Sequence, residues 1–301
     1  MTDIPYSKET TVKVGDIEIV YDTFGDPSAP PLLLIMGLGS QMILWEDAFC
    51  KAIASQGYWV IRFDNRDVGL STKLDDAGIP NLFALLQGET VEVPYKLSDM
   101  ASDAVGLLDA LNIDSAHVVG ASMGGMIAQT MAINYPGRIR TLTSIMSSTG
   151  NPDLPQPKPE VASILITTPP SDRDEYIEYE LKLWRMLNGP KFPPDEDYVR
   201  ERSAIAYDRS YYPQGTGRQF AAVLASGSRK EALKKLKTPT LVIHGDADPL
   251  VPIEGGRDTA EAIPGADLLI IEGMGHGIPV QVAPRIIEAI VRHAANRSKP
   301  L

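Results

Sequence analysis

The chain has 301 residues, of which 44% are apolar, so it is long enough to bury a large core and exceeds one small domain. Its 28 basic and 39 acidic residues give a net charge of −11, which disfavours nucleic acid and anionic membranes as partners. A single cysteine, Cys50, excludes an intrachain disulfide and a cysteine-rich metal site. Because no signal-peptide pattern and no membrane-spanning apolar run is apparent, we expect a cytoplasmic protein.

The first elements of the chain are predicted strands. Residues 11–14 and 17–23 alternate apolar and polar side chains around Gly15-Asp16, which predicts a β-hairpin. Residues 31–36 form a continuous apolar run, typical of a strand buried on both faces. This run leads into Gly37-Leu38-Gly39, where the glycines allow another backbone to approach closely.

A second group of elements follows, with a polar turn inside it. We predict helices over residues 45–56 and 99–111 and a strand over residues 58–63. The turn contains Asp64-Asn65-Arg66-Asp67, and we interpret it as stabilised by an Arg–carboxylate pair rather than as a metal cluster.

The sequence around Ser122 has the pattern of a nucleophile elbow. A β-branched run, His117-Val118-Val119, enters Gly120-Ala121-Ser122-Met123-Gly124, and a small-residue segment with helical character follows. In such an elbow the serine sits on a strained strand-to-helix turn, and the start of the helix directs free N–H groups toward it. The pattern therefore predicts an exposed serine at the edge of a sheet.

The composition changes after Gly150, where prolines become frequent and strand patterns stop. Three helices are predicted in this part of the chain, over residues 172–187, 195–208 and 219–226. The alternation then returns, with strands over 240–244 and 267–271 and helices over 255–263 and 280–296. We therefore predict an α/β fold, a mostly parallel sheet flanked by helices. Its core comprises residues 1–150 and 236–301, and residues 151–235 form an inserted helical cap.

A serine nucleophile needs a base, and the chain has four histidines. His117 precedes the elbow within its strand, His244 lies inside an apolar strand, and His293 belongs to the last predicted helix. His276 instead lies in a glycine-flanked loop after the last predicted strand, where sites of α/β proteins form. We predict His276 as the base.

The acid that orients the base is expected between the serine and the histidine. Two residues at one predicted strand end qualify: Asp248, which starts a rigid turn before Pro249, and Asp246, which could instead bind backbone amides. The residues favour Asp248 without excluding Asp246. An oxyanion needs two backbone N–H donors, and the best placed are those of Met123 and Leu38, although a plain tight turn also explains the loop that contains Leu38.

Apolar residues of the predicted cap are candidates for a substrate pocket. An ordinary apolar face of a cap helix explains them equally well. Together with Gly37 of the glycine loop, the candidates are Trp184, Met186, Leu187 and Phe192.

These features together resemble the α/β-hydrolase superfamily. The resemblance covers the Met36–Gly39 loop, the turn after Asp64, the elbow, residues 245–252 and Gly273-Met274-Gly275-His276. Within the superfamily it is strongest to carboxylesterases of the aclacinomycin methylesterase type. The resemblance implies Ser122 as nucleophile, Asp248 as acid, His276 as base, and Leu38 and Met123 as oxyanion donors.

The expected function is hydrolysis of carboxylic esters through an acyl-enzyme, with a small-molecule ester as substrate and neither metal nor cofactor. Perhydrolase or haloperoxidase activity, C–C bond hydrolysis, and lactone or macrolide ring opening are alternatives with the same triad. A slow small-molecule receptor is a further alternative. The sequence gives no indication of oligomeric state.

Overall fold

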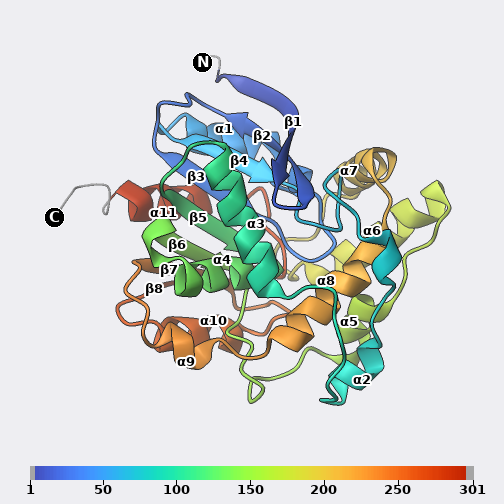
Figure 1. Cartoon of the computed structure of the whole chain (residues 1–301). Helices are drawn as coiled ribbons and strands as arrows, with labels where there is room; N and C mark the ends of the chain where they lie inside the picture. The colour runs from blue at the N-terminus through green and yellow to red at the C-terminus, as the bar shows by residue number, and fades with distance from the viewer. Residues whose placement is uncertain (1–3, 296–301) are drawn as a thin grey trace.

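The computed structural model describes residues 4–295 and contains one eight-stranded sheet (Figure 1). The strand order is β1-β2-β4-β3-β5-β6-β7-β8. The β1–β2 and β2–β4 pairs are antiparallel, and all other neighbours are parallel, so the predicted mostly parallel sheet is confirmed. The strands are β1 (Tyr6–Val14), β2 (Ile17–Phe24), β3 (Pro31–Ile35), β4 (Trp59–Phe63), β5 (Ala116–Ala121), β6 (Ile139–Ile145), β7 (Thr240–Gly245) and β8 (Asp267–Ile271).

Helices cover both faces of this sheet. The helices outside the β6–β7 connection are α1 (Asp47–Ala54), α2 (Leu82–Leu86), α3 (Leu97–Ala110), α4 (Met123–Asn134), α10 (Ile253–Ala262) and α11 (Ala283–Ala295). The β6–β7 connection carries α5 (Pro159–Ala162), α6 (Arg173–Leu187), α7 (Glu196–Arg209), α8 (Pro213–Ser226) and α9 (Lys230–Leu233). Short 3-10 turns lie at Met42–Leu44, Asp75–Ala77, Pro136–Arg138 and Ser163–Ile166.

The apolar run of β3 divides the core into two layers. Leu33 and Ile35 pack into a cluster with α3 and α4, whereas Leu32 and Leu34 pack into a second cluster with α1 and α11. All four side chains are fully buried, because successive residues of a strand point to opposite faces and both faces are covered. The continuous apolar pattern therefore reflects a central strand.

Most predicted elements are present, with shifted ends. β1 begins earlier than predicted, at Tyr6, and α8 begins earlier, at Pro213, which occupies the first turn of that helix. Gly215 and Gly217 lower the helix propensity of that first turn, which explains why the sequence pattern missed it. The short helix α2 was not predicted. The last helix begins at Ala283 rather than at residue 280, and its predicted end at Asn296 lies outside the described residues.

The helices α6, α7 and α8 of the β6–β7 connection lie together on the right of Figure 1, on the opposite side from α11. The connection is also tied to core elements, since the Ser226 hydroxyl of α8 accepts a hydrogen bond from the Leu97 amide of α3. Within residues 4–295, no helix is both long and apolar enough to span a bilayer.

Candidate active site

Ser122 occupies the sharp turn between β5 and α4. It is one of the few non-glycine residues with positive φ, at φ 54° and ψ −123°, a conformation that costs energy and is typical of functional turns. Glycine is required on either side of this turn, because there is no room for a side chain. A Cβ on Gly120 would lie 2.1 Å from the Gly124 carbonyl oxygen, and one on Gly124 would lie 2.1 Å from the Ile35 carbonyl oxygen. The elbow can therefore form only with glycine on both sides of the serine.

The chain brings Ser122, His276 and Asp248 together in one hydrogen-bonded row. The Nε2 atom of His276 lies 3.0 Å from the Ser122 hydroxyl, and its Nδ1 atom lies 2.8 Å from Oδ2 of Asp248. His276 follows β8 and Asp248 follows β7, so both lie at the carboxyl ends of parallel strands, as Ser122 does. This geometry suits proton transfer from the hydroxyl to an imidazole whose orientation is fixed by a carboxylate.

Asp248 is held as a charged acceptor. Its Oδ1 atom accepts hydrogen bonds from the amides of Leu250 and Val251, at 2.9 and 2.8 Å. Burial alone would raise the pKa of this carboxyl, but His276 and His244 outweigh burial and lower the pKa well below its usual range. Asp246 has a different role, since its carboxylate accepts a hydrogen bond from the Gly273 amide at 2.6 Å.

The other three histidines lie apart from the serine. His117 is buried within β5 and its Nδ1 atom lies 2.9 Å from the Thr141 hydroxyl. His293 of α11 donates to the Pro239 carbonyl oxygen at 3.2 Å. His244 is closer to the site, because its Nε2 atom donates to the Val251 carbonyl oxygen at 2.8 Å and lies 3.5 Å from Oδ2 of Asp248. Sequence patterns gave no sign of this second contact with Asp248.

The loop after β3 passes directly beside the serine. A Cβ on Gly37 would lie 3.1 Å from the Cβ of Ser122, which is tighter than ordinary van der Waals contact, so glycine favours this close approach of the loop. Neither the Leu38 amide nor the Met123 amide has a hydrogen-bond acceptor within the described part of the chain. Both residues line the same cavity as the Ser122 hydroxyl. Two unused donors beside a serine hydroxyl are the arrangement that would stabilise an oxyanion formed at that hydroxyl.

A cavity of about 1440 Å³ opens above Ser122, between the core and the helices of the β6–β7 connection. Trp184 and Leu187 of α6 line it, as does Gly37 of the loop after β3. Met186 does not: it lies two positions from Trp184 and so faces the other side of α6, where it is 41% exposed. Phe192 is also outside the lining, because it packs against the core cluster formed with α1 and α11. The pocket predictions for Met186 and Phe192 were therefore wrong.

The C-terminal end of α6 contacts the histidine loop directly. The amide of His276 donates a hydrogen bond to the Leu187 carbonyl oxygen at 2.8 Å. A Cβ on Gly275 would lie 2.1 Å from that same oxygen, so the two segments touch through backbone. The sequence does not indicate this contact, because a backbone carbonyl group carries no residue-specific pattern.

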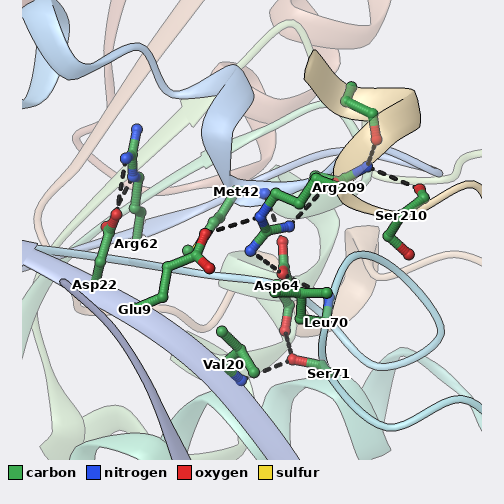
Figure 2. A network of polar contacts seen from close by, with 12 residues as sticks. Glu9, Val20, Asp22, Met42, Arg62, Asp64, Leu70, Ser71, Arg209 and Ser210 are labelled. Carbon is green, nitrogen blue, oxygen red and sulfur yellow. Dashed lines mark hydrogen bonds and ion pairs between the residues drawn. The ribbon is translucent and has the colours of Figure 1, made fainter. Parts of the chain in front are cut away.

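The polar turn after β4 binds two of the helices that cover the site, α7 and α8, and Figure 2 shows its contact with Arg209 of α7. Arg209 of α7 binds the buried carboxylate of Asp64 at 2.7 Å and also contacts Glu9 of β1 at 2.8 Å. Arg218 of α8 binds Asp67 through two hydrogen bonds of 2.8 Å, with both side chains almost fully buried.

The arginine within this turn pairs with neither of the two aspartates beside it. Arg66 binds Asp103 of α3 through two hydrogen bonds of 2.6 Å. The predicted Arg–carboxylate pair therefore exists, but its carboxylate comes from another element. Within residues 4–295, no group of three or more His, Cys, Asp or Glu residues is arranged to hold a metal ion.

Comparison with known proteins places this geometry among hydrolases. A family model described as the alpha/beta hydrolase fold matches residues 30–281. Rhodomycin D methylesterases from Streptomyces sp. (strain C5) and Streptomyces peucetius are 32% and 31% identical to the chain. Each match covers 92% of this chain and 95% of the relative.

Solved structures match with similar completeness. A hydrolase from Pseudomonas aeruginosa PA01 has a TM-score of 0.74 and 25% identity, with 95% of this chain and 97% of that chain covered. A thermophilic esterase from Thermogutta terrifontis has a TM-score of 0.75 and 22% identity, with 97% and 100% covered. The latter similarity establishes a shared fold.

Proposed function

The chain belongs to the α/β-hydrolase family, and from this premise we propose that it is a serine hydrolase that cleaves methyl esters of carboxylic acids. The observation that carries the proposal is the row Ser122–His276–Asp248, hydrogen-bonded at 3.0 and 2.8 Å within a large cavity. The two methylesterases that match most of the chain support an ester as the substrate.

The first half of the reaction forms an acyl-enzyme. The Ser122 oxygen attacks the ester carbonyl carbon while His276 Nε2 takes the hydroxyl proton, and Asp248 stabilises the resulting imidazolium. The carbonyl oxygen becomes an oxyanion and accepts hydrogen bonds from the Leu38 and Met123 amides. The tetrahedral intermediate then collapses, His276 returns the proton to the departing methoxide oxygen, and methanol leaves.

The second half repeats these roles with water. His276 takes a proton from a water molecule, whose oxygen attacks the acyl carbon. The same two amides stabilise the second oxyanion. Collapse breaks the bond to the Ser122 oxygen, which recovers its proton from His276, and the carboxylic acid is released.

In this proposal residues 151–235 act as a cap that shapes the substrate cavity. Perhydrolase or haloperoxidase activity, C–C hydrolysis and lactone opening would use the same three residues, Ser122, His276 and Asp248. We favour simple ester hydrolysis, because the two relatives named as methylesterases are 32% and 31% identical to the chain, whereas those named as an enol-lactonase and a chloroperoxidase are 25% and 29% identical.

The proposal is tested by active-site labelling and turnover. A fluorophosphonate is expected to label Ser122, and mass spectrometry of the digested protein locates the label. Ser122→Ala is expected to lose both the labelling and the hydrolysis of p-nitrophenyl butyrate and of aromatic methyl esters. Removing the nucleophile typically costs about 10⁶-fold in kcat.

Ser147→Ala serves as the matched control, because this serine is also buried beside α4 but makes no hydrogen bond with Ser122, His276 or Asp248. It is expected to keep wild-type labelling. Methyl ester turnover that persists in Ser122→Ala would overturn the proposed mechanism.

A further inference from the structure

Trp184 lies at the centre of an unusual polar group inside the cavity. Its indole ring packs beside the loop that carries His276, since a Cβ on Gly277 would lie only 3.0 Å from the ring. The indole N–H donates to Oε2 of Glu180 at 3.3 Å, and the guanidinium carbon of Arg202 lies 4.5 Å from the ring centroid. The Trp184 ring therefore lies between Gly277, the residue that follows His276, and the side chains of Glu180 and Arg202.

Arg202 has no hydrogen-bond or ion-pair partner within the described part of the chain. Its contacts are with the faces of Trp184 and Tyr198, the latter at 5.7 Å from the guanidinium carbon to the ring centroid. Stacking of this kind occupies the flat face of the guanidinium and leaves the N–H donors at its edge unused. Arg202 lines the cavity, so these donors are available to a ligand there.

The Glu180 carboxylate also has unused hydrogen-bond acceptors. Apart from the bond with Trp184, its carboxylate has no hydrogen bond within residues 4–295, although each carboxylate oxygen can accept two. Burial raises the pKa of Glu180 and lowers that of Arg202, so the cavity disfavours each charge taken alone. The two side chains lie farther apart than the 4.0 Å of an ion pair. The charge of each nevertheless contributes to the pKa of the other.

The charges around this group select the kind of ligand. Glu180, Glu46 and Asp195 are the acidic residues in the cavity lining, and Arg202 is its one arginine or lysine. A ligand anion at Arg202 would be repelled by Glu180 and Glu46, and a ligand cation at Glu180 would be repelled by Arg202. A neutral group with both donors and acceptors meets neither penalty and satisfies both side chains.

We propose that Glu180 and Arg202 form a polar subsite that binds a neutral hydroxyl- or amide-bearing group of the substrate, remote from the ester. A hydroxyl or carboxamide there accepts from Arg202 and donates to Glu180, while Trp184 packs against the adjoining apolar part. The inference rests on the proposed ester hydrolysis and adds to it the chemistry of the distal part of the substrate.

The test uses methyl esters of ω-phenylalkanoic acids over a series of chain lengths. Each length is prepared with an unsubstituted ring and with para-hydroxymethyl, para-carboxamide, para-carboxylate or para-aminomethyl groups, and kcat/KM is measured for all. The unsubstituted esters report the hydrolytic activity itself. The ratio of substituted to unsubstituted kcat/KM at the same length reports the subsite.

For the wild-type protein, a neutral polar substituent at one chain length is expected to raise kcat/KM about tenfold, the effect of a hydrogen bond to a charged group. Arg202→Met and Glu180→Gln are expected to reduce that ratio, while the unsubstituted esters change less than about twofold. Arg202→Lys, which keeps the charge and loses the planar fork, is expected to retain part of the ratio and serves if the Met variant does not fold.

Arg200→Met is the matched control, because Arg200 lies on the same helix but pairs with Glu178 and Glu196 outside the cavity. It is expected to leave the ratio unchanged. The inference is overturned if no neutral substituent raises kcat/KM at any length, if the carboxylate or ammonium ester is preferred, or if Arg202→Met slows all esters equally. Absence of hydrolysis for every ester, unsubstituted ones included, would instead overturn the proposed function.

Discussion

Gln219 of α8 accepts a hydrogen bond from the amide of Gly39 at 2.8 Å, although 180 positions separate the two residues. Its side-chain nitrogen donates to the Arg66 carbonyl oxygen at 2.7 Å, and the whole side chain is buried. A residue of a covering helix therefore fixes the peptide that follows Leu38. Because Leu38 supplies a proposed oxyanion donor, Gln219 is a positioning residue for that donor.

Gln219→Leu is expected to lower kcat by about ten- to a hundredfold with little change in KM, because the oxyanion forms only in the transition state. The variant also leaves the Gly39 amide and the Arg66 carbonyl without a partner, so it is expected to lose about 1–3 kcal/mol of stability. Steady-state kinetics and urea unfolding measure the two effects.

Gln129→Leu is the control for Gln219→Leu. Gln129 is equally buried, and neither it nor its partners Ser144 and Arg229 line the cavity. It is expected to lose similar stability and keep kcat. Equal losses of kcat in the two variants would show that destabilisation, rather than loop position, explains the result.

Replacement of the two neighbouring aspartates separates their roles. Asp248→Asn is expected to lower kcat about 10⁴-fold, because an amide in place of this carboxylate favours the wrong tautomer of the base. Asp246→Asn keeps an oxygen that can accept from the Gly273 amide, so kcat is expected to remain within about threefold of wild type. Kinetics with p-nitrophenyl butyrate measure both, and a reversed order of effects would assign the acid to Asp246.

Replacing only one residue of the Arg218–Asp67 pair is expected to reduce the stability of the fold strongly. Arg218→Met leaves the fully buried Asp67 carboxylate uncompensated and is expected to lose about 3–5 kcal/mol of stability. The double variant with Asp67→Asn is expected to lose less than the sum of the single losses. Urea unfolding measures each variant, and additive losses would contradict the prediction.

An exposed pair on the same group of helices provides the comparison. Arg173 and Asp208 are about half exposed and lie 2.7 Å apart. Arg173→Met is expected to change the urea midpoint far less than Arg218→Met does, because solvent screens such exposed pairs.

His117 is expected to make stability dependent on pH. Burial, with smaller contributions from Arg140 and His293, lowers its pKa from 6.5 to about 4. The unfolded chain therefore takes up a proton at a higher pH than the folded protein does. The contribution of His117 is complete above pH 6.5 and declines as the pH falls toward 4.

His117→Leu removes this titration, and the variant lacks the contact with Thr141 at every pH. The difference in urea midpoint between wild type and variant is expected to shift in favour of the variant as the pH falls from about 7 to about 4.5. A difference that stays constant over this range would contradict the lowered pKa.

Features whose cause lies in short stretches of chain were predictable from the sequence. The buried strands follow from apolar runs, and the elbow follows from glycines that stand where two backbones nearly touch. The proximity of Ser122, Asp248 and His276 was predictable because each lies just after a strand, and the ends of parallel strands converge. Local pattern and local geometry agree at these positions.

Contacts between distant segments were not predictable. Arg209, Arg218 and Gln219 lie far along the chain from the groups they bind, and nothing in their neighbourhoods identifies the partner. The pocket assignment of Met186 failed for a related reason. A helix buries one face, and composition alone does not reveal which face of a partly polar helix lies inward.

The hydrogen bond from the His276 amide to the Leu187 carbonyl has a consequence for grafting experiments. Exchanging residues 151–235 with the corresponding segment of a relative transfers a new pocket and also replaces the backbone acceptor that holds the loop of the base. A chimaera whose segment ends α6 at a different angle is expected to turn over every substrate slowly, including those that fit its new pocket. We therefore expect recombination at these boundaries to change substrate preference and catalytic rate together.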